Sequence, residues 1–148
     1  MTVHTWTVTV ARKPEEVFAY LADISRHSEW SPKPYSIEAM TDGPIHVGSK
    51  YRSTGWLPGK PHNVNEVEIT RLESPTRLSF VAREAGGVFK HDFVLTPQDG
   101  GTRVDRTIDL PKPPGFQGVV FPLVFAVFVK GAIQKGQNML KAKMEAGA

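Results

Sequence analysis

The chain has 148 residues, of which 40% are hydrophobic and 22% charged, with a net charge of +3 and no cysteine. This length is typical of one domain, so we expect a single domain over residues 1–148. The absence of cysteine excludes disulfides, thiolate metal sites and cysteine nucleophiles. The N-terminus shows neither the basic nor the apolar region of a signal peptide, so we expect a cytoplasmic, bacterial-type protein.

The N-terminal segment predicts one strand followed by two short helices. Residues 3–10 alternate between apolar and threonine side chains for most of their length, which is typical of a half-buried strand. Pro14, followed by two glutamates, marks the start of a short amphipathic helix. Asp23 or Ser25 caps a second short helix, which ends near Trp30, before two prolines.

A series of short strands separated by turn residues follows. Gly86-Gly87 and Asp99-Gly100-Gly101 are typical hairpin turns. Because such connections are short, we expect consecutive strands to pair antiparallel. The predicted strand ranges are 35–40, 49–56, 63–72, 78–83, 88–96 and 102–110.

The C-terminal region predicts one long helix. After the proline-rich segment 111–115, the pattern is helical from about residue 117 to about residue 145, with Gly136 and Leu140 on its apolar stripe. The apolar run 119–129 would rise only about 16 Å as a helix, so we expect a buried helix rather than a membrane span. This helix is the only predicted element large enough to cover one face of the sheet.

Three segments resemble a known family: residues 8–23 (VTVARKPEEVFAYLAD), 27–32 (HSEWSP) and 95–104 (LTPQDGGTRV). They are similar to the START-like superfamily of polyketide cyclases/dehydrases and lipid-transport proteins, also called SRPBCC. The resemblance implies an α+β helix-grip fold. In that fold a curved antiparallel sheet of six or seven strands wraps around a long C-terminal helix and encloses an apolar cavity.

The resemblance also implies what the protein does. The first expectation is binding, or transport, of a small hydrophobic ligand such as a lipid, a polyketide or an aromatic metabolite. The alternative is an enzyme, a polyketide cyclase/aromatase or dehydratase that uses an acid–base pair in the cavity. The chain lacks the cysteine ligands of the ring-hydroxylating oxygenases in this superfamily.

The strand 88–96 carries the first candidate site. Alternation places Phe89, His91, Phe93 and Leu95 on one face. An imidazole among phenylalanines can hydrogen-bond a ligand or act as a general base, which makes His91, Phe89 and Phe93 candidate ligand-binding residues. The alternative is a core histidine whose hydrogen bonds are satisfied by neighbouring residues.

Arg106 is the second candidate, because it shares its face of the last strand with apolar side chains. A buried guanidinium needs an anion or several acceptors, since an unpaired buried charge is costly. One interpretation is that Arg106 recognises a carboxylate, phenolate or enolate, or forms an acid–base pair with His91. The other is an ion pair with Glu66, Glu68 or Asp105, or a bulge that turns Arg106 outward.

Three further aromatic residues are candidate ligand contacts. Trp30 ends the second short helix, beside the expected cavity mouth, and Phe121 and Phe125 lie on the predicted long helix. The alternative for each is packing within the core without any ligand contact.

Several kinds of chemistry and partner have no signal in the sequence. There is no Gly-x-Ser-x-Gly motif and no phosphate-binding glycine loop, and the five histidines lack metal-ligand spacing, so we expect no cofactor and no metal. The lysines of the last helix are spread at helical spacing rather than clustered with aromatics, which argues against nucleic acid. A weak contact with an anionic membrane surface stays open, as does the oligomeric state.

Overall fold

The structure is a computed structural model that describes residues 2–31, 35–57, 60–84, 87–110 and 130–147. The side chains at 2, 56–57, 60–63, 84 and 110 also lie outside the description. The elements in chain order are β1 (Thr2–Val10), α1 (Pro14–Ala22), the 3-10 helix η1 (Ile24–Trp30), β2 (Tyr35–Ala39), β3 (Lys50–Leu57), β4 (Lys60–Glu73), β5 (Arg77–Glu84), β6 (Gly87–Gln98), β7 (Gly101–Leu110) and α3 (Lys130–Glu145).

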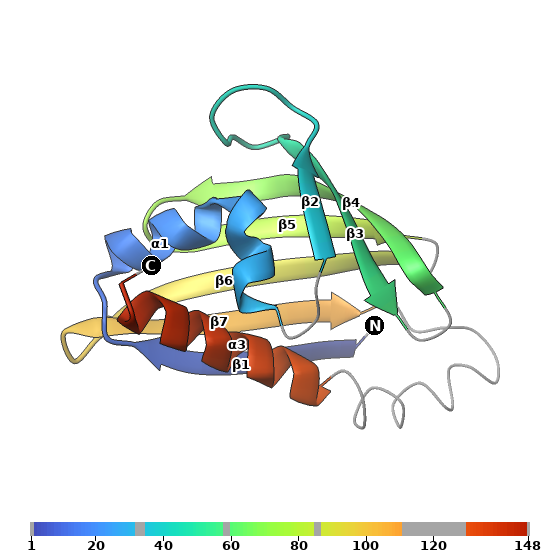
Figure 1. Cartoon of the computed structure of the whole chain (residues 1–148). Helices are drawn as coiled ribbons and strands as arrows, with labels where there is room; N and C mark the ends of the chain where they lie inside the picture. Colours follow the sequence, from blue (N-terminus) through green and yellow to red (C-terminus); the bar gives the residue numbers. More distant parts are fainter. Residues whose placement is uncertain (1, 32–34, 58–59, 85–86, 111–129, 148) are drawn as a thin grey trace.

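The strands form one antiparallel sheet of seven in the order β1-β7-β6-β5-β4-β3-β2 (Figure 1). From β2 to β7 each strand pairs with its neighbour in sequence, as the short turns predicted, and β1 joins the sheet beside β7. The register shifts once between Gly55 and Leu57 and once between Ile69 and Arg71. Such irregularities bend strands, and Figure 1 shows a strongly curved sheet. The predicted α+β helix-grip architecture is confirmed.

The two short helices begin where the sequence indicates. Pro14 opens α1, and the Glu16 carboxylate accepts hydrogen bonds from the Lys13 backbone N–H at 3.2 Å and from Arg12 Nε at 2.9 Å. The second helix, η1, has Asp23 at its N-cap and ends at Trp30, but its turns are of the 3-10 type. Ser25 does not cap this helix; its hydroxyl donates to the Asp23 carboxylate at 2.6 Å.

Among the described residues, α1, η1 and α3 all pack on the sheet, and η1 does so against β2. α3 contacts β1 and η1, whereas α1 contacts β5, β6 and β7 (Figure 1). The sequence analysis assigned this cover to the long helix alone, and residues 117–129 of that predicted helix lie outside the described residues. In α3, Gly136 and Leu140 are buried as predicted, and so is Gln137, whose Nε2 donates to the Trp6 carbonyl at 3.4 Å.

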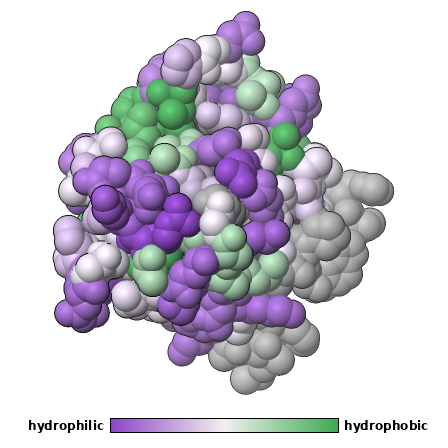
Figure 2. All heavy atoms as spheres, turned by 60° about the vertical axis from the view of Figure 1, so that its left-hand side comes forward, coloured by the Kyte–Doolittle hydropathy of each residue, from purple (hydrophilic) through white to green (hydrophobic). Residues whose placement is uncertain are grey.

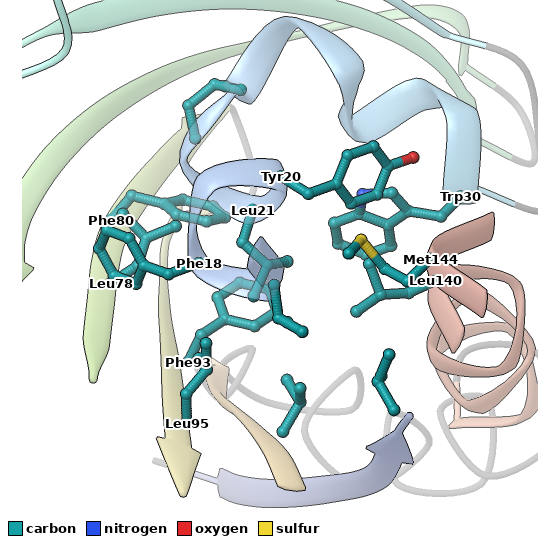
Figure 3. Packing of buried hydrophobic residues seen from close by; sticks show 14 of the residues in the cluster. Phe18, Tyr20, Leu21, Trp30, Leu78, Phe80, Phe93, Leu95, Leu140 and Met144 are labelled. Carbon is teal, nitrogen blue, oxygen red and sulfur yellow. The ribbon is translucent and has the colours of Figure 1, made fainter. Parts of the chain in front are cut away.

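The inner face of the sheet and the helices share one apolar core. Figure 3 shows side chains of β5 and β6 on one side, side chains of η1 and α3 on the other, and side chains of α1 reaching both. The outer face is polar: Thr7 bonds Asp105 there, and Arg77 bonds Asp92. Figure 2 shows a mainly hydrophilic surface with smaller hydrophobic areas. Among the described residues, no helix has the length and apolar character needed to cross a membrane.

The close packing of the start of β7 against the end of β1 can be tested at Gly101. Gly101 is buried, and a Cβ placed there would collide with the Val10 carbonyl oxygen. We expect Gly101→Ala to lower the free energy of unfolding, measured by urea denaturation, by about 1–3 kcal/mol. Gly131→Ala is the matched control, because a Cβ there meets nothing within 4 Å. That helical substitution should leave stability unchanged or raise it by up to about 1 kcal/mol. Equal stabilities of the two variants would contradict this account.

Candidate functional site

The sheet register brings Arg106 and His91 together. Arg106 on β7 pairs with Phe93 on β6, and His91 on β6 pairs with Phe80 on β5. Phe93 and His91 are two residues apart, so both side chains point to the inner face. Arg106 and His91 are therefore diagonal neighbours, and Arg106 Nη2 lies 3.5 Å from His91 Nδ1.

Arg106 lies between two aromatic rings. Its Cζ atom is 5.3 Å from the ring centroid of Phe93 and 5.4 Å from that of Trp30. The two rings meet edge to face, with centroids 6.1 Å apart and an interplanar angle of 87°. Both distances are within the range of cation–π attraction, which partly offsets the desolvation of the guanidinium.

Two histidines extend this aromatic cluster. His91 stacks on Phe80 with centroids 4.6 Å apart and nearly parallel planes. His27 on η1 is buried, and its ring centroid lies 4.9 Å from that of Trp30. Because a carbonyl can only accept, His27 Nε2 donates the 2.6 Å hydrogen bond to the Leu21 carbonyl.

The electrostatics leave one charged group in this cluster. Burial lowers the pKa of Arg106 to about 10, so its guanidinium stays protonated at neutral pH. Burial, and then the nearby Arg106 charge, lower the pKa of His91 well below its ordinary value. Burial also lowers the pKa of His27 to about 4 and raises that of Tyr35 to about 12. At pH 7 both imidazoles and the phenol are therefore neutral.

The acids that the sequence analysis named as ion-pair partners do not neutralise Arg106. Glu66 and Glu68 lie near Arg83 instead, and Asp105 accepts from Thr7 and Arg103 on the outer face. No bulge turns Arg106 outward either, since the β7 register runs unbroken beside both neighbours.

Two buried donors of this cluster have no hydrogen-bond partner among the described residues. They are the Nε of Arg106 and the Nε1 of Trp30. A donor left unpaired in the interior costs more than a satisfied one contributes. The cluster therefore has two N–H donors that the described part of the protein leaves without an acceptor.

The predicted site residues are thus placed as follows. Arg106 contacts Trp30, Phe93 and His91, and Phe89 lies further along β6, half-buried beside Trp6 and Ile108. Phe121 and Phe125 lie outside the described residues. Their roles in ligand binding stay predictions.

Sequence reasoning missed two residues of this site. His27 lies three positions before Trp30, a helical spacing that places two side chains side by side and could have indicated it. Tyr35 pairs with Gly55, where a Cβ would lie only 3.1 Å from the Tyr35 Cβ, so glycine leaves room for its ring. No pattern in the sequence linked Tyr35 to Arg106, because that proximity depends on the curvature of the sheet.

Chemically, the inner face combines a large apolar surface with one cation that can donate hydrogen bonds. Such a surface can hold an apolar molecule and fix the position of one polar group on it. Among the described residues, no three His, Asp or Glu side chains are grouped so that they would hold a metal ion.

Comparison with known proteins places this geometry in a family. Residues 1–145 match the family described as polyketide cyclase / dehydrase and lipid transport. The chain belongs to this family. Its members share a fold suited to hydrophobic ligands, which agrees with the apolar inner face. No curated protein matches the chain.

Solved structures share the fold at low sequence identity. TTHA0849 from Thermus thermophilus has a TM-score of 0.77 and 18% identity, covering 99% of this chain and 100% of its own. MLL2253 from Mesorhizobium loti has a TM-score of 0.74 and 15% identity, covering 99% of each chain. CV1439 from Chromobacterium violaceum has a TM-score of 0.73 and 15% identity, covering 98% of this chain and 99% of its own.

The buried neutral histidine predicts how stability depends on pH. The pKa of His27 is lowered from 6.5 to about 4, so between these values the folded protein binds fewer protons than the unfolded chain. Its contribution to stability is complete above pH 6.5 and is lost as the pH falls toward 4. In His27→Gln the amide still donates to Leu21 but does not titrate. We expect the loss of unfolding free energy from pH 7 to 4.5 to shrink by about 2 kcal/mol, measured by urea denaturation. An unchanged pH dependence in this variant would contradict the assignment.

Proposed function

We propose that this protein binds a small hydrophobic molecule, such as a lipid, a polyketide or an aromatic metabolite, on the inner face of its sheet. The observation that carries the proposal is Arg106, a half-buried cation between Trp30 and Phe93 whose buried Nε has no partner among the described residues. A core built only for stability has little use for such a group, because withdrawing an unpaired charge from water opposes folding. Membership of a lipid-transport and polyketide-cyclase family supports the same function.

The proposed roles divide between apolar and polar contacts. Trp30, Phe93 and Phe89 form the wall against the apolar body of the ligand, and His91 and Arg106 face its polar end. The sequence analysis adds Phe121 and Phe125 to the wall. Removing about 300 Å² of apolar ligand surface from water would contribute about 7 kcal/mol before the costs of ordering.

The alternative from the sequence analysis is a polyketide cyclase/aromatase or dehydratase. The contact between His91 and Arg106 is the observation that favours it, since an acid–base pair needs two such groups within reach. Two features make His91 a weak base, however. Its Nδ1 faces a cation, and its pKa is lowered well below the ordinary value. Binding without chemistry therefore fits this geometry better.

Other expectations from the sequence remain predictions. They are the cytoplasmic location, the absence of a cofactor and of a nucleic-acid partner, and a weak contact with a membrane surface.

A neutral fluorescent probe tests the proposed function. N-phenyl-1-naphthylamine should bind saturably, with enhanced fluorescence, because the inner face offers an apolar surface shielded from water. Phe89→Ser should weaken this binding about tenfold, since it removes a phenylalanine side chain from the wall. The matched control is Lys90→Ser, whose side chain is exposed on the opposite face of β6.

Two results would count against this proposal. One is a fluorescence titration that does not saturate, in protein shown to be folded by circular dichroism. The other is equal weakening by the two serine variants, which would place the probe elsewhere on the protein.

A further inference from the structure

Most of the hydrogen-bonding groups near Arg106 are donors, and the Tyr35 phenol can both donate and accept. A guanidinium has five N–H groups and no acceptor, and an indole Nε1 is a donor only. Because Arg106 cannot accept, its contact with His91 requires the His91 Nδ1 to be the acceptor. A neutral imidazole of this kind carries its proton on Nε2, so the free edge of His91 is a donor as well.

Within the described residues, no carboxylate on the inner face pairs with the charge of Arg106. Alternation along β4, β6 and β7 sends their described carboxylates to the outer face, where Glu68, Asp92 and Asp105 pair with arginines. Among the described residues, no carboxylate forms a salt bridge with Arg106. The cluster therefore combines uncompensated positive charge with an excess of donors.

These two properties select among polar groups on an apolar molecule. An alcohol oxygen can accept from these donors, but it supplies no negative charge and no second acceptor oxygen, and an amine would add a second positive charge beside the first. A carboxylate brings acceptors only, supplies the missing negative charge, and matches the planar fork of a guanidinium with its two oxygens.

We propose that the ligand of this site is an apolar carboxylic acid, held as its carboxylate by Arg106, with its chain or ring against Trp30, Phe80 and Phe93. This inference rests on the proposed function, because it names the class of hydrophobic ligand that the inner face takes. Trp30 Nε1–H and the Nε2–H of His91 are the further donors available to the carboxylate oxygens.

Three matched ligands test the proposal by displacement of bound N-phenyl-1-naphthylamine at pH 8, below the concentration at which they form micelles. They are decanoate, decan-1-ol and decylamine, which share one alkyl chain and differ in the head group. Decanoate should displace the probe at a concentration at least about tenfold lower than the concentration of decanol required. Decylamine should be the weakest competitor of the three.

A pair of variants locates the preference. Arg106→Met puts an apolar side chain of similar length on the inner face, and the affinity of each variant for the probe is measured first, so that displacement is compared as the ratio of decanoate to decanol concentrations. In this variant decanoate should lose its advantage over decanol. Arg103→Met is the matched control, because Arg103 lies exposed on the outer face of the same strand and pairs with Asp105. It should keep the full preference for decanoate.

The outcomes separate this inference from the proposed function. Suppose that the wild-type protein binds the probe and that decanoate and decanol displace the probe equally well. Hydrophobic binding then stands, and the proposed preference for a carboxylate is excluded. If the preference survives in Arg106→Met, or is lost equally in Arg103→Met, Arg106 is not its source and the proposal is overturned. If the folded wild-type protein binds neither the probe nor any of the three ligands, the proposed function itself fails.

Discussion

The register of one antiparallel sheet is the constraint on which the rest of this structure depends. Side chains alternate between the two faces of a strand, so a slip of one residue would exchange inner and outer residues throughout a strand. With the observed pairing, the ion pairs of β4 to β7 lie on the outer face and the apolar core on the inner one. The same pairing carries Arg106 inward opposite Phe93. The site is thus a consequence of the register that builds the core.

Burying Arg106 opposes folding, and the surrounding residues limit the cost. The rings of Phe93 and Trp30 attract the guanidinium, and neutral His91 accepts one contact from it. None of them supplies a negative charge. His27 adds a further buried polar ring, kept neutral and tied to the Leu21 carbonyl. Polar groups that destabilise a fold and gather at one place are typical of functional sites.

Much of the fold followed from local patterns in the sequence. Alternation and turn residues located the strands to within a few residues, and Pro14 marked the start of α1. Alternation also indicated the inward facing of His91 and Arg106. The same patterns could not show which residues of other elements would meet them. Tyr35 approaches Arg106 through the curvature of the sheet. His27 had only its spacing of three from Trp30 as a signal, and that spacing does not show which strand residues the imidazole meets.

The polar groups around Arg106, rather than the fold shared with other proteins, carry the proposal about the ligand. Solved structures with 15–18% identity share its fold, so the fold alone cannot name a ligand. An apolar wall discriminates weakly between hydrophobic molecules, because each methylene contributes only about 1 kcal/mol. A half-buried cation beside further donors discriminates more strongly, since a wrong head group leaves charge and N–H groups unsatisfied. Under the proposed function, ligand choice depends on the few polar atoms around Arg106, while the aromatic residues set the strength with which an apolar body is held.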